Sequence, residues 1–142
     1  MAQEQVTARG ACLCGAVRYE VRGPLRAVFT CHCDECRAFT GSVWQATAAR
    51  KERVSVEGVE YLAWYQSSPR ARRGFCRECG SSLFMEPTDG RPYVAIAAGT
   101  LEKPTGLERA VHIWTAEAGD YYPIDDAIPR HADGEHGLPQ PE

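Results

Sequence analysis

Apolar and polar residues alternate along much of this chain in short runs, the pattern of strands that bury one face. Val17, Tyr19 and Val21 show it most clearly, and it recurs at residues 54–56 and 111–113. Glycine and proline separate these runs at short intervals, as in all-β domains. The pattern therefore predicts a mainly β fold with one short helix. The helix is expected at 34–39, a more buried strand at 93–98, and further strands at 27–30, 43–48, 61–65 and 82–85.

Length and composition agree with one globular domain. The chain has 142 residues, of which 44% are hydrophobic and 25% charged, which excludes extended disorder and coiled coil. No internal repeat or linker divides the sequence. We therefore expect a single domain over residues 1–142, with its core at about 11–130. The segment 131–142 is rich in proline, glycine and charge, so it is expected to be a mobile tail.

Charge and hydropathy narrow the possible partners. The formal net charge of −3 argues against a generally basic nucleic-acid-binding protein. No window approaches the roughly 18 consecutive apolar residues of a membrane span, and the first residues lack the apolar stretch of a signal sequence. We therefore expect a cytoplasmic protein with neither a membrane nor a nucleic-acid partner.

The cysteines carry the chemical information in this sequence. There are 7 of them, an odd number that disulfides would leave unbalanced, and no export signal accompanies them. They fall into a CxC, a CxCxxC and a CxxC group, each beside an expected strand. Close pairs of thiols on tight turns are typical of metal knuckles, whereas free core cysteines rarely cluster in this way. The groups are Cys12 and Cys14, then Cys31, Cys33 and Cys36, then Cys76 and Cys79.

The spacing alone allows two ways to combine these groups. In the first, CxC meets CxxC in a closed four-thiolate site, and CxCxxC forms a three-thiolate site with an open position. In the second, the last two cysteines of CxCxxC meet CxxC as a zinc ribbon. The second arrangement leaves three cysteines without a role, which makes it the weaker account.

Five motifs surround the cysteines and the last expected strand: CLCGAVRYEV, CHCDECRAFTGS, FCRECGSSLF, GTLEKP and HIWTAEAGDYYPIDDAIPR. Together they resemble the glutathione-dependent formaldehyde-activating enzyme family, over about residues 11–130. The resemblance implies the β-tent zinc fold, in which several short coiled antiparallel sheets carry zinc knuckles, and two Zn²⁺ ions per chain. It implies a structural zinc at Cys12, Cys14, Cys76 and Cys79 and an open, catalytic zinc at Cys31, Cys33 and Cys36.

The function implied is that of a carbon–sulfur lyase acting on glutathione, or a similar thiol, and formaldehyde or another small aldehyde. Three thiolates make zinc a poor Lewis acid for hydrolysis, so holding an added thiolate is the better use of the open position. No further catalytic residue and no substrate-binding residue is assigned. The alternative is a zinc-stabilised binding module that recognises a protein partner without catalysis. Methionine sulfoxide reduction, suggested by shared fold alone, would lack a free cysteine nucleophile.

Several polar residues near the cysteines have plain structural interpretations. His32 lies between two cysteines and is expected to point away from their metal, and His112 is expected to pack in the core or at its rim. Asp34 and Glu35 are expected to stabilise the start of the short helix. The basic segment 67–75 is read as a solvated hairpin loop, ahead of a clamp for the carboxylates of a peptide thiol and of a nucleic-acid contact.

Overall fold

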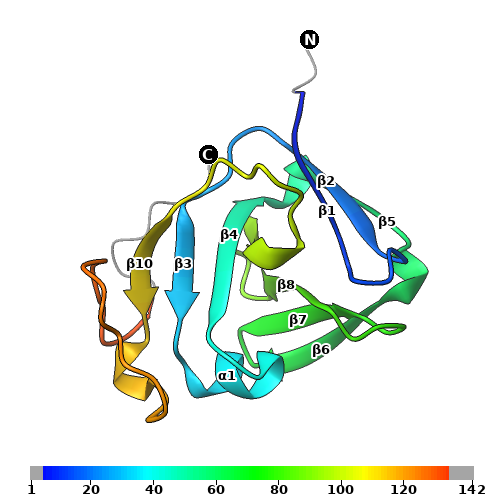
Figure 1. Cartoon of the computed structure of the whole chain (residues 1–142). Coiled ribbons are helices and arrows are strands. Elements are labelled where there is room, and N and C mark those ends of the chain that lie inside the picture. The colour runs from blue at the N-terminus through cyan, green and yellow to red at the C-terminus, as the bar shows by residue number, and fades with distance from the viewer. Residues whose placement is uncertain (1–4, 135–142) are drawn as a thin grey trace.

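The structure, a computed structural model, describes residues 5–134. Within this range the chain forms ten strands, one α-helix and four 3-10 turns (Figure 1). The helix α1 spans Asp34–Thr40, and the 3-10 turns span Lys51–Arg53, Val59–Tyr61, Ala98–Thr100 and Thr115–Glu117. The strands are β1 Val6–Ala11, β2 Arg18–Arg22, β3 Val28–Cys31, β4 Trp44–Arg50, β5 Val54–Glu57, β6 Leu62–Ser68, β7 Ala71–Cys76, β8 Ser82–Pro87, β9 Tyr93–Ala97 and β10 Arg109–Ile113.

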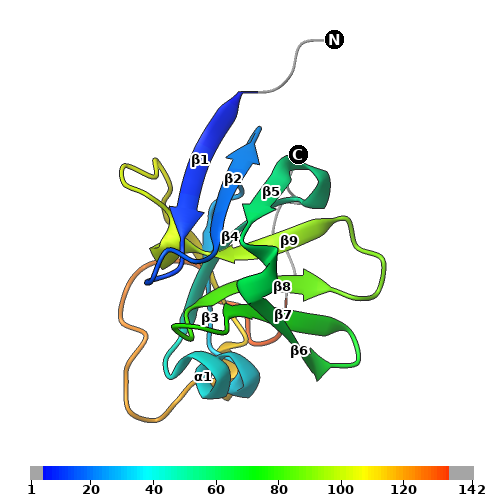
Figure 2. The same cartoon turned by 90° about the vertical axis from the view of Figure 1, so that its right-hand side faces the viewer.

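The strands form two sheets. A three-stranded sheet has the order β1-β2-β5, and a seven-stranded sheet has the order β10-β3-β4-β9-β8-β7-β6. The larger sheet is strongly coiled, so that β6 and β7 run across the direction of β3 and β4 (Figures 1 and 2). The mainly β fold class predicted from the sequence is confirmed. One pair departs from the antiparallel expectation, because β10 pairs with β3 in parallel.

The main core fills the space between the two sheets. Val17, just before β2, and Tyr19 and Val21 within β2 are almost fully buried against Leu83 and Phe84 of β8. The rings of Tyr19 and Phe84 meet edge to face at 5.2 Å, a geometry that adds to the gain from burial. Burying each such side chain stabilises the fold by roughly 1.5–3 kcal/mol. The alternating apolar residues of the sequence therefore join the two sheets.

The short helix carries two of the cysteines. Its N-cap is Cys33, whose sulfur accepts a hydrogen bond from the Cys36 amide at 3.3 Å. Asp34 and Glu35 occupy its first turn, where negative charge is favourable. The helix ends at Gly41, which adopts a φ of 84° and donates its N–H to the Arg37 carbonyl. Glycine adopts this left-handed conformation without steric cost.

Two strands were not expected from the sequence, β1 and β7. β1 is half exposed and has little apolar alternation. The reading of residues 67–75 as a solvated loop is wrong, since β7 covers Ala71–Cys76 and a short turn joins it to β6. Arg73 within it is buried, which the hydrophobic pattern could not indicate. Gly74 leaves room for the Trp64 ring, because a Cβ at this position would lie 3.0 Å from the ring and would press it aside.

The first residues of the expected tail follow β10. Arg130 forms an isolated parallel bridge with His112, and the amides of Trp114 and Thr115 donate to the carbonyls of Asp133 and His131. Residues 135–142 lie outside the described residues, so the expected mobile tail is described only at its start. None of the helices among residues 5–134 is both long and apolar enough to span a bilayer.

Candidate metal centre

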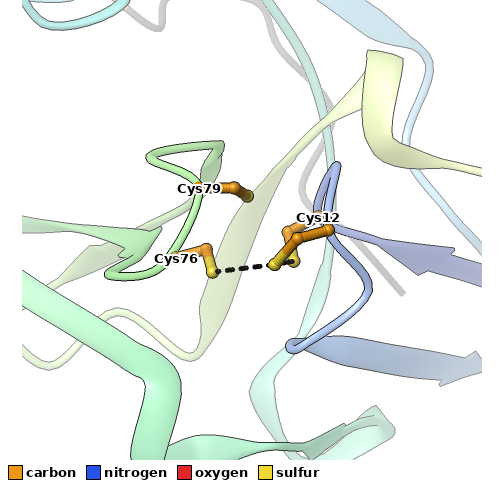
Figure 3. Close-up of side chains that lie close together, drawn as sticks. Cys12, Cys76 and Cys79 are labelled. Atoms are coloured by element: carbon orange, nitrogen blue, oxygen red, sulfur yellow. Dashed lines mark hydrogen bonds between the residues drawn. The ribbon is translucent and has the colours of Figure 1, made fainter.

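A first cluster of four cysteines joins the two sheets. Cys12 and Cys14 lie in the turn between β1 and β2, and Cys76 and Cys79 lie at the end of β7 and in the turn that follows (Figure 3). All four sulfurs lie within 4.8 Å of one another. The Cys14 sulfur is 3.7 Å from that of Cys12 and 3.8 Å from that of Cys76. This spacing suits a single ion surrounded by four thiolates.

The backbone around the first cluster is arranged to stabilise thiolates. The amide of Val17 donates to the Cys12 sulfur at 3.3 Å, and the amide of Glu78 donates to the Cys76 sulfur at 3.4 Å. Ser81 connects the two turns, because its hydroxyl lies 3.2 Å from the Cys79 sulfur and accepts the Leu13 amide at 2.9 Å. Donors of this kind favour the ionised form of a thiol.

A second cluster contains the remaining three cysteines. Cys31 ends β3, Cys33 caps α1, and Cys36 lies in the first turn of α1. Their sulfurs also lie within 4.8 Å of one another. Cys31 and Cys36 are buried, whereas Cys33 is half-buried. Solvent therefore reaches this cluster from the side of Cys33.

The three thiols of the second cluster oppose one another's ionisation. Hydrogen bonds from Cys31 and Cys36 lower the pKa of Cys33 to about 2. The hydrogen bonds to Cys33 and Cys36, together with burial, raise the pKa of Cys31 far above its usual value. The cluster therefore favours one thiolate, and full ionisation requires a cation. A donor set made only of sulfur fits zinc well.

These two groups are the metal-competent clusters found among the described residues. One cluster joins the CxC and CxxC groups, and the other consists of the CxCxxC group alone. The zinc-ribbon arrangement does not describe the positions of the sulfurs, because Cys33 and Cys36 lie with Cys31 rather than with Cys76 and Cys79.

A buried guanidinium lies against the second cluster. Arg73, only 4% exposed, donates from Nη2 to the Cys36 sulfur and to Glu35 Oε2, both at 3.2 Å. The rings of Phe39 and Trp44 lie 5.6 and 5.5 Å from its guanidinium carbon. Glu35 thus does more than favour the start of the helix. No sequence pattern indicated this contact, because Arg73 and Cys36 are 37 positions apart along the chain.

His32 and His112 belong to a chain of buried hydrogen bonds. His32 Nε2 lies 2.9 Å from His112 Nδ1, and His32 Nδ1 lies 2.7 Å from the Tyr122 hydroxyl. His112 Nε2 lies 3.0 Å from Asp126 Oδ1. With Asp126 ionised, His112 donates to it, His32 donates to His112, and the Tyr122 hydroxyl donates to His32. Burial lowers the pKa of His32, which agrees with a neutral His32 ring.

This chain accounts for both ring nitrogens of His32, so they face Tyr122 and His112 rather than a metal. Arg37 strengthens the same region by donating from Nε to the His32 carbonyl at 3.1 Å. Its Nη2 donates to the Glu117 carbonyl at 2.8 Å and also contacts Asp34. Arg37 therefore ties the CxCxxC turn to the segment that follows β10.

An open cleft of about 580 Å³ lies between the β6–β7 hairpin and the end of β10. Met85 on its floor also packs against the core cluster that contains Cys31 and Cys36. The cleft carries both signs of charge and one large aromatic ring. Its lining residues are Ser68, Arg70, Ala71, Met85, Arg91, Trp114, Asp133 and Gly134.

Two all-cysteine clusters on a coiled β fold define a protein with two groups of sulfurs that could each hold a metal ion. The family model described as glutathione-dependent formaldehyde-activating enzyme matches residues 7–117. The chain therefore belongs to the glutathione-dependent formaldehyde-activating enzyme family, and the resemblance carried by its motifs is confirmed.

Individual relatives agree with this assignment. An uncharacterized lyase of Schizosaccharomyces pombe is 34% identical to this chain over 85 residues. The match covers 59% of this chain and 61% of the lyase, which is less than two thirds of its length. A Halomonas elongata protein with the provisional name glutathione-dependent formaldehyde-activating enzyme is 30% identical over 129 residues, covering 82% of this chain and 80% of its own. The crystal structure of a Rhodobacter sphaeroides protein matches with a TM-score of 0.58 and 30% identity, covering 71% of this chain and 97% of that one.

Proposed function

We propose that this protein is a zinc-dependent enzyme of the carbon–sulfur lyase type. It would form or cleave the adduct of glutathione, or a similar thiol, with formaldehyde or another small aldehyde. The observation that carries the proposal is the contrast between four grouped sulfurs at one cluster and three at the other. Zinc takes four protein ligands in structural sites and three plus an open position in catalytic sites. The three-cysteine cluster is therefore the candidate reaction centre.

Zinc bound by Cys31, Cys33 and Cys36 would supply an open coordination position that keeps an added thiol deprotonated at neutral pH. Because Cys33 is the half-buried member, the thiol would approach from its side. In the net reaction, the sulfur bonds to the carbonyl carbon, the carbonyl π bond breaks, and the thiol proton ends on the new hydroxyl oxygen. The reverse reaction cleaves the carbon–sulfur bond, and neither direction requires an oxidant or a reductant.

The cleft beside Met85 is the place that we propose for the rest of a peptide thiol. Glutathione carries carboxylates and an ammonium group, and the cleft offers Arg70 and Arg91 on one side and Asp133 on another. Trp114 adds an aromatic surface. Arg70, at the tip of the β6–β7 hairpin, would hold a carboxylate of the peptide thiol, a role that the sequence allows for the segment 67–75.

The test is native mass spectrometry of the purified protein with and without glutathione, repeated with Cys33→Ser. We expect two zinc ions and one glutathione in the unchanged protein, and one zinc without glutathione in the variant. Catalysis would then be measured by NMR, which follows the exchange between ¹³C-formaldehyde and its glutathione adduct. The unchanged protein should accelerate this exchange.

Two other outcomes overturn the proposal. Two zinc ions without glutathione would contradict thiol activation and favour the alternative, a zinc-stabilised module that binds a protein partner. One zinc ion or none in a folded chain would contradict the two-site assignment itself.

A further inference from the structure

Bound Zn²⁺ would leave a net negative charge at both clusters, and at the second cluster this charge would increase when an added thiol binds. Three thiolates around one Zn²⁺ leave one net negative charge, and a fourth thiolate from a substrate would make it two. Cys31 and Cys36 are buried, so water screens this charge poorly on their side. A buried cation beside the cluster would offset it.

Arg73 is placed to be that cation. It is 4% exposed, and its Nη2 atom donates to the Cys36 sulfur at 3.2 Å. The Phe39 and Trp44 rings beside it hold the guanidinium in place and keep it dry. A hydrogen bond in which the donor is charged and desolvated is among the stronger ones.

Among residues 5–134, the carboxylate that pairs with Arg73 is that of Glu35, whose side chain is 36% exposed. This partly hydrated carboxylate neutralises the guanidinium less effectively than a buried one would. Part of the positive charge of Arg73 therefore remains available to the sulfurs. Salt pairing with Glu35 alone does not explain why the side chain is directed at Cys36.

We propose that Arg73 is a positioning residue that offsets the charge of the three-cysteine site and so allows it to accept a fourth, exogenous thiolate. This inference rests on the proposed function, and it adds a residue outside the cysteine motifs. It predicts that Arg73 acts more strongly on the binding of the added thiol than on the folding of the chain.

The experiment compares Arg73→Met with Arg72→Met, its neighbour in β7. The Arg72→Met variant loses the same charge as Arg73→Met. Arg72, however, lies on the other face of the strand, 4.0 Å above the Trp64 ring and paired with Glu86. Glutathione affinity is measured by calorimetry on zinc-loaded protein, and zinc affinity by competition with a chromophoric chelator. The four-cysteine cluster serves as an internal reference in every sample.

We expect Arg73→Met to weaken glutathione binding by about 10- to 100-fold, the usual scale for groups that hydrogen-bond a metal ligand. Arg72→Met should change it by less than about 3-fold. Arg73→Lys, which keeps the charge but cannot contact Cys36 and Glu35 with one planar group, should recover part of the loss. A purely structural role would not produce this rescue.

Glu35→Gln provides a test that does not require removal of a buried side chain. It removes the charge that competes for Arg73, so glutathione should bind more tightly, by about 2- to 5-fold, the scale of one partly exposed charge. Weaker binding or no change would contradict the proposal.

The outcomes separate this inference from the proposed function. If the unchanged protein holds two zinc ions and glutathione, and Arg73→Met binds glutathione equally well, the role of Arg73 is overturned while the proposed function stands. If the unchanged protein fails to bind zinc at the three-cysteine cluster, both are overturned.

Discussion

The two cysteine clusters are built from the same ligand but in different surroundings. The first draws its cysteines from two turns that belong to different sheets, and backbone amides and Ser81 support its sulfurs. The second draws its cysteines from six consecutive residues and is surrounded by charged and titratable side chains, Arg73, Glu35 and His32 among them. The first cluster therefore joins turns from the two sheets, whereas the second lies within one short segment of the chain beside charged side chains.

This difference follows from separation along the chain. A metal that joins residues far apart in sequence removes much freedom from the unfolded chain, so its binding energy becomes folding energy. A metal within one short turn closes a small loop and contributes less to the overall fold. Removal of the two metals should therefore have unequal consequences.

The largest effect is expected for Cys76→Ser. Cys76 is fully buried and shares the first cluster with Cys14, 62 positions away along the chain. A structural zinc contributes on the order of 10 kcal/mol, so the variant should not fold stably at 37 °C. Circular dichroism and the NMR amide dispersion would measure the loss.

Cys33→Ser is the matched control for that variant. It changes the half-buried member of the second cluster and should leave the dispersion of the remaining amides intact. Equal loss of structure in Cys76→Ser and Cys33→Ser would contradict the different roles of the two clusters in folding.

A chelator should remove zinc from the two clusters at different rates. In a fixed excess of a strong chelator, the zinc of the second cluster should leave first, because its open coordination position admits the chelator. The first zinc should leave more slowly by at least about 10-fold, because its release is linked to unfolding. Absorbance of the chelator–zinc complex, recorded with tryptophan fluorescence, checks this. A single phase with simultaneous unfolding would contradict it.

The same contrast explains what the sequence could predict. Each cysteine group is local, so its spacing was visible, although the way the groups combine stayed open until the family resemblance favoured one arrangement. The neighbours of the second cluster were not visible. Arg73 lies 37 positions from Cys36, and Tyr122 lies 90 positions from His32, so no local pattern in the sequence could indicate these contacts. Alternation predicted most strands but missed β1 and β7, and in β7 an arginine, Arg73, occupies one of the buried positions.

A smaller effect is expected for Tyr122→Phe, which acts only near the second cluster. The change removes the hydroxyl that donates to His32 Nδ1 and leaves a nitrogen of a 2% exposed side chain without its partner. The cost should be about 1–3 kcal/mol of unfolding free energy, measured by urea denaturation of zinc-loaded protein.

The control is Tyr121→Phe, because Tyr121 is the adjacent residue and is 63% exposed. It should cost less than about 0.5 kcal/mol. Equal stabilities of the two variants would show that the buried hydrogen-bond chain does not support the cluster.

The smallest effect is expected in the cleft. Arg70 is 74% exposed in its side chain and paired with Asp89 at 3.4 Å, so its attraction for a carboxylate of glutathione is screened by water and shared. Arg70→Ala should raise the dissociation constant of glutathione by about 2- to 5-fold and leave the zinc content at two ions. Arg22→Ala removes the same charge from β2 in the other sheet and should change nothing. If both variants weaken binding equally, the effect is that of net charge, and the cleft is not where the peptide part of the thiol lies.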